Sequence, residues 1–254
     1  GVLSIRTRQP ANAALRFAPR LLVGSDGLRR LQIQASGRAT AHRYAVGVHQ
    51  VQSEGYRQHA YGKMRGLNAL VHRIVGKNAE VSFLLNAHDA PYLFNPSSLN
   101  RAVADTASRT ARSFIVRQGA SKKVRQTQGG ISLRYAHGTE DVSQFVLYGI
   151  RRDLENPIPG RIVQLGRSAG GVRYVRSGRL HTLRYTAGID AEWQRDQRDE
   201  FKNDGLPEGD VGQMDDARIF DRIQYGERQL DQRETVRGIG PFLSLDVPLN
   251  RRWT

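Results

Sequence analysis

Hydrophobic and polar residues alternate along most of the chain, and residues 181–193 show the clearest example. One set of alternate positions is mainly apolar: Leu183, Tyr185, Ala187, Ile189, Ala191 and Trp193. The intervening positions are Thr182, Arg184, Thr186, Gly188, Asp190 and Glu192. A period of two predicts a β-strand with one apolar and one polar face. The stretch exceeds the roughly 5–6 residues usual for globular strands and fits the about 9–11 residues of a transmembrane barrel strand.

Similar segments recur from end to end, with turn-forming residues between them. The predicted strands are 14–24, 28–37, 43–52, 63–75, 79–88, 122–137, 142–152, 161–176, 180–195 and 234–247, while 219–230 is loop or strand. Short connections are expected at 25–27, 38–42, 76–78, 138–141 and 177–179. Longer ones are expected at 53–61, 89–121, 153–160 and 196–217, with a short helix within 99–117. Apart from 25–27, short and long connections alternate, which is typical of an outer-membrane barrel.

This pattern predicts an all-β fold, an antiparallel meander of about ten long strands without crossover helices. We expect an open, partial transmembrane β-barrel. Because arginine on the lipid-facing side costs about 2–4 kcal/mol at mid-bilayer, the polar face should point inward. Leu183, Tyr185, Ile189 and Trp193 are therefore predicted to face outward, and Arg184, Asp190 and Glu192 inward.

The composition narrows the choice of function. The net charge is +15, from 39 Lys and Arg against 24 Asp and Glu. This charge could allow the protein to bind nucleic acid or another polyanion, but the arginines are scattered and no nucleic-acid motif accompanies them. We therefore expect no nucleic-acid partner. The 254 residues contain no cysteine, which excludes disulfides and thiolate chemistry. The low hydrophobic fraction of 39% is compatible with a barrel, whose lipid-facing residues are diluted by lumen and loops.

No catalytic or metal-binding constellation is apparent. His88 and Asp89 are adjacent in a predicted strand, so their side chains should diverge. The seven histidines lack metal-ligand spacing. The acidic stretch 199–216 lacks the ordered oxygen-ligand spacing of a calcium loop, so we interpret it as a solvated loop. We expect no enzyme activity, no resident metal and no cofactor.

Three short motifs, in their order and spacing, resemble TonB-dependent outer-membrane receptors of the ferric-siderophore type. Residues 1–8 read GVLSIRTR and resemble the end of that family's plug domain. Residues 24–30 read GSDGLRR and resemble its first barrel hairpin. Residues 53–57 read SEGYR and resemble its recurrent polar-acidic-Gly-Tyr-Arg exit from the third strand. The resemblance covers essentially the whole chain.

The resemblance implies that residues 1–9 end a plug domain and residues 10–254 form the N-terminal portion of an incomplete barrel. Barrels of this family have about twenty-two strands, so we expect an open sheet rather than a small closed barrel in which 14–24 pairs with 234–247. The implied function is uptake of a ferric-siderophore or similar metal chelate across a Gram-negative outer membrane. The implied partners are TonB, through a missing N-terminal region, and outer-membrane lipid and lipopolysaccharide.

Two other functions stay open at this point. One is a passive, porin-like outer-membrane barrel without energy coupling, which the plug-like residues 1–8 argue against. The other is a basic, soluble, β-rich protein that binds nucleic acid, which the apolar strand faces argue against.

The candidate ligand-binding residues are aromatic and arginine side chains of the expected long loops. Arginine offers paired donors to carboxylate or catecholate oxygens, and tyrosine offers a flat ring with a hydroxyl. The alternative is that the tyrosines form an interfacial girdle and the arginines contact lipopolysaccharide. The eight candidates are Tyr56, Arg57, His59, Tyr61, Tyr92, Phe94, Arg151 and Arg152.

Overall fold

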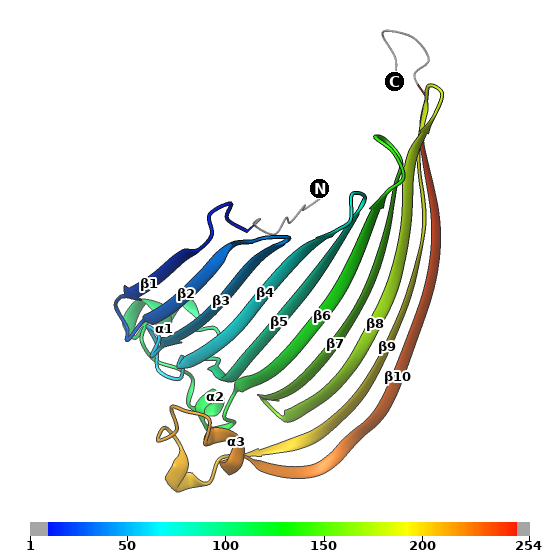
Figure 1. Ribbon diagram of the computed structural model, residues 1–254. Coiled ribbons are helices and arrows are strands. Elements are labelled where there is room, and N and C mark those ends of the chain that lie inside the picture. Colours follow the sequence, from blue (N-terminus) through cyan, green and yellow to red (C-terminus); the bar gives the residue numbers. More distant parts are fainter. Residues whose placement is uncertain (1–9, 248–254) are drawn as a thin grey trace.

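Ten antiparallel strands, each paired with its neighbours in sequence, form a single curved sheet in the computed structural model, which describes residues 10–247 (Figure 1). The strands are β1 (Arg16–Val23), β2 (Arg29–Ala39), β3 (His42–Ser53), β4 (Gly62–Val75), β5 (Ala79–Phe94), β6 (Ser121–Ala136), β7 (Val142–Ile158), β8 (Arg161–Leu180), β9 (Leu183–Gly205) and β10 (Gln224–Asp246). The predicted all-β meander is confirmed. The predicted plug end, residues 1–9, and residues 248–254 lie outside the described residues.

The sheet is open. Within residues 10–247, β1 pairs with β2 and β10 pairs with β9, and the two edge strands do not pair with each other. The expected open sheet is therefore confirmed, and the small closed barrel is not observed. The strands lengthen along the chain, from 8 residues in β1 to 23 in β9 and β10, so the later strands extend well beyond the earlier ones (Figure 1).

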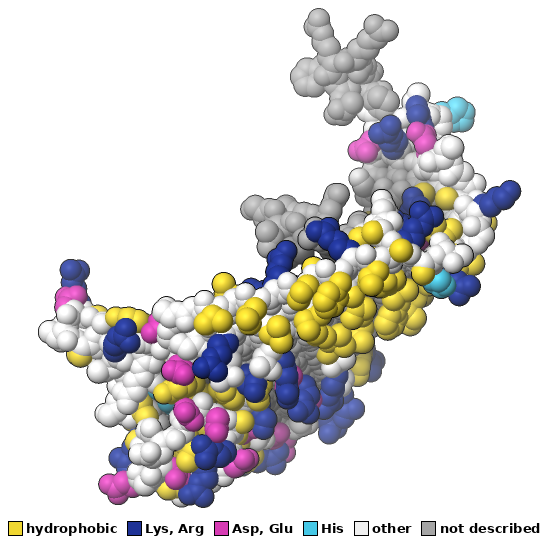
Figure 2. Space-filling view, turned by 60° about the vertical axis from the view of Figure 1, so that its left-hand side comes forward, with side chains coloured by type: hydrophobic (Ala, Val, Ile, Leu, Met, Phe, Trp, Pro, Cys, Tyr) yellow, Lys and Arg dark blue, Asp and Glu magenta, His cyan; other side chains and the backbone are white. Residues whose placement is uncertain are grey.

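The two faces of the sheet differ in chemistry. The register aligns an apolar belt through all ten strands, with Leu21, Ile33, Val48, Leu67, Leu85, Ile131, Leu147, Val172, Ile189 and Ile239 among its members. Figure 2 shows a band of hydrophobic side chains with Lys and Arg along its border. The opposite face carries polar side chains in rows, as the alternation predicts.

The polar face is the concave one. In β3, Val46 and Val48 on the apolar face are exposed, whereas Ala45, Gly47 and His49 on the polar face are half-buried. The same contrast recurs in β6 and β7. Side chains on the inside of a curved sheet crowd together, so the less exposed face is the inner one. Leu183, Tyr185, Ile189 and Trp193 lie on the convex face and Arg184, Asp190 and Glu192 on the concave face, as predicted; contact with lipid stays a prediction.

Several predicted connections are wrong because the strands continue through them. β7 and β8 are joined by residues 159–160 alone, where 153–160 was expected to be a loop. Pro157 pairs with Ile162 inside the ladder, so this proline does not end its strand. The turn between β8 and β9 lies at 181–182 rather than 177–179, since Leu180 still pairs with Leu183. His181 takes the left-handed conformation, with φ 58°, that this tight turn requires.

Two of the predicted long loops are shorter than expected. β5 runs on to Phe94, and a register shift between Ala90 and Leu93 accommodates Pro91. β9 runs on to Gly205, so Asp199, Glu200 and Asp204 of the supposed acidic loop lie in a strand. The segments 219–230 and 234–247 do not form two strands: a short helix begins at 219, and β10 takes up most of the rest.

The helices all lie in the connections at one end of the sheet (Figure 1). They are α1 (Arg101–Thr106) and α2 (Ser113–Arg117) between β5 and β6, and α3 (Ile219–Arg222) with a 3-10 turn (Glu208–Asp210) between β9 and β10. The helix expected within 99–117 is thus present as two helices. No helix in residues 10–247 has the length and apolar character needed to cross a membrane.

Candidate functional site

At the end of the sheet that carries the long connections, these connections pack together around a small hydrophobic core. Its buried members come from two strands, β5 and β8, and from the connection between β9 and β10. They are Tyr92, Phe94, Ile162, Leu206, Ile219, Phe220 and Ile223, with Tyr61, Phe201, Val211 and Met214 packed against them. These loops are therefore a packed structure rather than separate solvated segments. We call this end the loop rim and the opposite end, with connections 40–41, 76–78, 137–141 and 181–182, the turn rim.

The side chains of Arg57 and His59 join the connection 54–61 to the connection 95–120 through hydrogen bonds. The Arg57 guanidinium donates to the backbone oxygens of Pro96, Ser97 and Thr110. The His59 ring is 3% exposed, lies 4.7 Å from the Phe94 ring and donates from Nε2 to the Ala120 oxygen at 2.9 Å. Burial lowers the pKa of His59, which keeps the ring neutral. Both side chains are thus occupied in holding loops together.

The aromatic candidates divide into one exposed residue and three core residues. Tyr56 is 50% exposed, its hydroxyl lies 2.8 Å from Ser108 Oγ, and its ring faces the Arg109 guanidinium at 4.7 Å. Tyr61, Tyr92 and Phe94 pack in the core of the loop rim. Tyr92 and Phe94 belong to β5, so their expected position in a loop is corrected. Only Tyr56 of these four presents its ring to solvent.

A buried polar network, not predicted from the sequence, joins the remaining parts of the loop rim. Asn203 donates from Nδ2 to the backbone oxygens of Gln118 and Ile158 and accepts from the Gly205 amide. Gln118 accepts from the Gly160 amide at 2.8 Å. Both side chains are buried. Residues 203–205 lie within the stretch 196–217 that was expected to be a loop, so the sequence did not predict this buried anchor.

Arg151 and Arg152 lie in β7, not in a loop, and point to opposite faces of the sheet. Arg151 is on the convex face, where it donates to Ser168 Oγ and Asp153 Oδ1, each at 2.9 Å. It belongs to a charged border of the apolar belt that also contains Arg65 and Arg125, both paired with Asp89. Arg152 is on the concave face. The structure therefore places these two candidates, which were expected beside one long loop, on opposite faces of a strand.

The concave face carries one complete polar row. Register pairs run across all ten strands through Arg20, Gln32, His49, Gly66, His88, Gln126, Arg152, Arg167, Asp196 and Glu234. Its most ordered part joins β8 to β9. There Arg167 forms a two-pronged pair with Asp196, with Nε to Oδ1 at 2.8 Å and Nη2 to Oδ2 at 2.6 Å. Period-two alternation can place Arg152, Arg167 and Asp196 on the polar faces of their own strands, but it does not determine the register that aligns them in one row.

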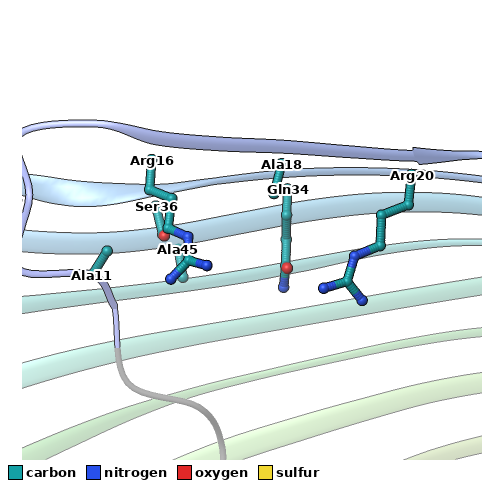
Figure 3. Close-up of a pocket in the computed structure, with 7 residues that line it drawn as sticks. All are labelled: Ala11, Arg16, Ala18, Arg20, Gln34, Ser36 and Ala45. Carbon is teal, nitrogen blue, oxygen red and sulfur yellow. The ribbon is translucent and has the colours of Figure 1, made fainter.

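A hollow on the concave face lies beside β1. Figure 3 shows Arg16, Arg20, Gln34 and Ser36 projecting to the same side of the sheet, with Ala11 of the segment before β1 across from them. The hollow holds about 80 Å³ and is lined by these residues with Ala18 and Ala45. The chain before β1 therefore reaches the concave side of the sheet.

The side chains of the concave face and of the loop rim are suited to binding a ligand. In residues 10–247, no three His, Asp or Glu side chains are grouped so that they could hold a metal ion. The concave face offers guanidinium, amide and imidazole groups, and the loop rim offers an exposed tyrosine. These groups bind anions and polar, flat molecules through hydrogen bonds and ion pairs.

Comparison with solved structures gives a consistent fold. The chain is similar to FpvA of P. aeruginosa bound to heterologous pyoverdines, with 10% identity and a TM-score of 0.73 over 96% of this chain and 36% of that one. It is similar to the ferric yersiniabactin uptake receptor FyuA from Yersinia pestis, with 12% identity and a TM-score of 0.70 over 96% and 38%. It is also similar to the copper transporter OprC, with 12% identity and a TM-score of 0.63 over 96% and 36%.

The chain thus spans less than two-fifths of the length of these three proteins. Comparisons with models of protein families and with curated protein sequences both gave no match. At this level of identity the likeness establishes the fold: an antiparallel sheet shaped like part of the barrel of such receptors and transporters.

Proposed function

We propose that this chain is part of an outer-membrane receptor that takes up a metal chelate, in the first place an iron–siderophore complex, driven by TonB. The observation that carries the proposal is the two-faced sheet. A continuous apolar belt on the convex face suits the hydrocarbon of a bilayer, and a polar concave face suits a wet lumen. The similar solved structures include proteins described as siderophore and copper receptors or transporters, which supports the same class.

The convex face supports the proposed location in a Gram-negative outer membrane. The apolar belt is bordered on the side of the loop rim by charged residues that include Arg65, Asp89, Arg125 and Arg151. Charged side chains are cheap at the membrane interface and costly at its centre. We propose that the belt contacts lipid and that this border contacts lipopolysaccharide.

The ligand would enter from the loop rim and meet the concave face. Of the eight candidate residues, Tyr56 is exposed at the loop rim and Arg152 is half-buried on the concave face, so these two are the candidates that we propose for contact with a ligand. The other six have structural contacts: Arg57 and His59 join loops, Tyr61, Tyr92 and Phe94 pack in the core, and Arg151 lies on the convex face. The proposal includes no catalytic step and no resident cofactor, and iron is the cargo.

An uptake measurement in cells tests the function. A strain that lacks the full-length protein should lose uptake of a radiolabelled ferric chelate at nanomolar concentration, and the protein should restore it only when TonB is present. A panel of ferric siderophores and a copper complex should be used, since similar structures include both kinds of transporter. Restored uptake without TonB would favour the passive porin-like barrel.

Fluorescence quenching tests the membrane topology. Trp193 is 40% exposed on the convex face and lies in a row with Gly170 and Arg237. In the full-length protein, with Trp193 as the only tryptophan, we expect brominated lipids to quench its emission. Placing the tryptophan instead at Gln194, on the concave face, should give much weaker quenching. Equal quenching at both positions would contradict the assignment of the two faces.

A further inference from the structure

Two histidines of the concave face flank a glycine on the strand between them. His49 on β3 pairs with Gly66 on β4, and Gly66 pairs with His88 on β5. All three belong to the polar row that crosses the concave face, so alternation places both imidazoles on the same side of the sheet. Because glycine has no side chain, the position between the two histidines carries no group that would keep their rings apart.

The His49 ring occupies the space above Gly66. A Cβ atom added at Gly66 would lie 2.5 Å from His49 Cε1 and 2.9 Å from His49 Nε2. The His49 side chain therefore leans across β4 toward β5, with a ring nitrogen over the glycine. His88 lies one strand spacing further on, about 4.7–4.9 Å, which puts its imidazole within reach of the same point.

Met64 supplies a third donor atom beside the same glycine. It precedes Gly66 by two residues on β4, so alternation places its side chain on the concave face as well. It is a diagonal neighbour of both histidines, and diagonal neighbours lie about 7–8 Å apart, within the reach of long side chains. Methionine is unbranched and has three rotatable bonds, so its sulfur can turn toward Gly66. The two histidines and Met64 are all half-buried.

The chemistry of these donors favours copper. Imidazole nitrogen is a good ligand for copper and zinc, and thioether sulfur selects the soft copper(I) ion. The other positions next to Gly66 on this face hold Gly47, Val51, Asn68 and Asn86, none of which is acidic. Calcium and magnesium prefer carboxylates and other oxygen ligands, so a site of two imidazoles and a thioether disfavours those ions.

We propose that His49, His88 and Met64 form a binding site for a copper(I) ion on the concave face of the sheet. Spacing along the chain did not reveal this site, because its donors come from three strands and one of them is a methionine. The inference goes beyond the proposed function, since binding here needs the folded sheet and neither TonB nor a chelate. The two imidazoles supply the main affinity, and the thioether supplies the preference for the monovalent ion.

Competition for copper(I) tests the site independently of iron uptake. The full-length protein in detergent is titrated with copper(I), kept reduced by ascorbate under nitrogen, in the presence of the chelator bicinchoninate. We expect His49→Gln and His88→Gln each to bind one equivalent of copper(I) less than the parent. Loss of a ligand should weaken affinity more than about 100-fold, because removing a group that only orients a ligand already costs about 10- to 100-fold.

Met64→Leu tests the thioether, because leucine keeps the volume but offers no donor atom. Copper(I) affinity should fall about 10- to 100-fold, the range seen when a ligand shell is altered. Zinc affinity should stay within about twofold, since zinc sites in proteins use thiolate, imidazole and carboxylate ligands. Met214→Leu is the matched control. Met214 packs against the core of the loop rim, so this variant should bind copper(I) as the parent does.

Gly66→Ala tests the geometry without removing a donor. The added Cβ would displace the His49 ring, so the variant should lose the same equivalent of copper(I) as His49→Gln. Gly47→Ala is its control on the same face, because a Cβ there would meet the side chain of Gln34 at 3.3 Å and leave the two histidines in place. We expect copper(I) binding in this control to match the parent.

Equal copper(I) binding in the parent and in both histidine variants would overturn the proposal, and this is also the result expected if another segment of the protein covers the two rings. Undiminished affinity in Met64→Leu or in Gly66→Ala would overturn the arrangement of three donors around the glycine. Thermal midpoints are measured for all variants. A loss of copper(I) binding in Met214→Leu or Gly47→Ala as large as in the test variants would show that binding follows general stability, which also overturns the site.

Discussion

The turn rim and the loop rim close the same strands by different means. At the turn rim, neighbouring strands are joined by two to five residues, and the conformations are local: Thr40, Gly76 and His181 each take positive φ values of 48–66°. At the loop rim, distant segments meet in a core and in buried hydrogen bonds, such as Asn203 Nδ2 to the Gln118 oxygen at 2.8 Å across 85 residues. The turns of the turn rim are determined by the residues within each turn, whereas the structure of the loop rim depends on tertiary contacts.

This difference indicates where the molecule can respond to a ligand. A tight turn between paired strands opens only when the ladder opens. The loop rim is held by a limited set of side chains, so it can loosen as a unit while the sheet stays intact. The comparison predicts that substitutions at the loop rim have larger local effects than chemically identical ones at the turn rim. All measurements below use the full-length protein in detergent.

The largest contrast is expected for Ile219→Ala against Ile74→Ala. Ile219 is fully buried in the core of the loop rim, while Ile74 near the turn rim is 52% exposed. Removing a buried isoleucine costs about 2–5 kcal/mol through lost burial and the cavity left behind. Hydrogen exchange should show strongly increased exposure of residues 206–223 in Ile219→Ala and little change anywhere in Ile74→Ala. Similar exchange in the two variants would show that the core does not hold this rim.

A pair of glycines gives the next contrast. Gly205 and Gly76 both have positive φ, +87° and +66°, so alanine at either position is strained by about 1–2 kcal/mol. A Cβ at Gly205 would also lie 2.9 Å from the Arg117 backbone oxygen, whereas at Gly76 it would meet nothing within 4 Å. Overpacking adds about 1–3 kcal/mol. Gly205→Ala should therefore lower the thermal midpoint more than Gly76→Ala does. Equal shifts would leave backbone strain as the whole effect.

Loss of the Arg57 guanidinium should release one loop without unfolding the core. Arg57→Met keeps the apolar stem but removes the donors to Pro96, Ser97 and Thr110, at a cost of about 1–3 kcal/mol. Limited proteolysis should then cut within 95–112. Arg101→Met is the control, since the Arg101 side chain is 94% exposed and, among residues 10–247, pairs only with Asp105. Cleavage that is equally rapid in the control would contradict the fastening role.

The sequence alone predicted the parts of the fold that depend on period-two alternation. It gave the ten strands, their order and the outward face of Trp193. It failed at residues 153–160, which were expected to form a loop with Pro157, whereas Pro157 pairs with Ile162 inside the ladder and is fully buried. It also failed for Tyr92 and Phe94, whose burial depends on Ile162 and Phe220, far away in the chain. The pairing of Arg167 with Asp196 required the register between β8 and β9, which alternation does not determine.

The smallest expected effect is a pH dependence confined to the loop rim. Burial lowers the pKa of His59 in the fold below its ordinary value of about 6.5. The unfolded or detached state then binds the proton more tightly, so the neutral ring stabilises the closed rim above about pH 6.5. That stabilisation is lost progressively as the pH falls from there through the folded pKa. The protection factors of the amides at residues 95–120, which are corrected for the slower intrinsic exchange in acid, should be lower at pH 5 than at pH 7.5.

His59→Gln isolates this effect. Glutamine can still donate to the Ala120 oxygen, which His59 Nε2 approaches to 2.9 Å, but it does not titrate. The variant should keep the rim closed with less pH dependence at residues 95–120, while exchange near His181 at the turn rim should respond to pH as in the parent. An undiminished pH response at residues 95–120 would assign it to other groups. Because the Phe94 ring lies against His59, protonation would place a charge beside the aromatic core, which is the physical reason for the loss of protection expected at residues 95–120.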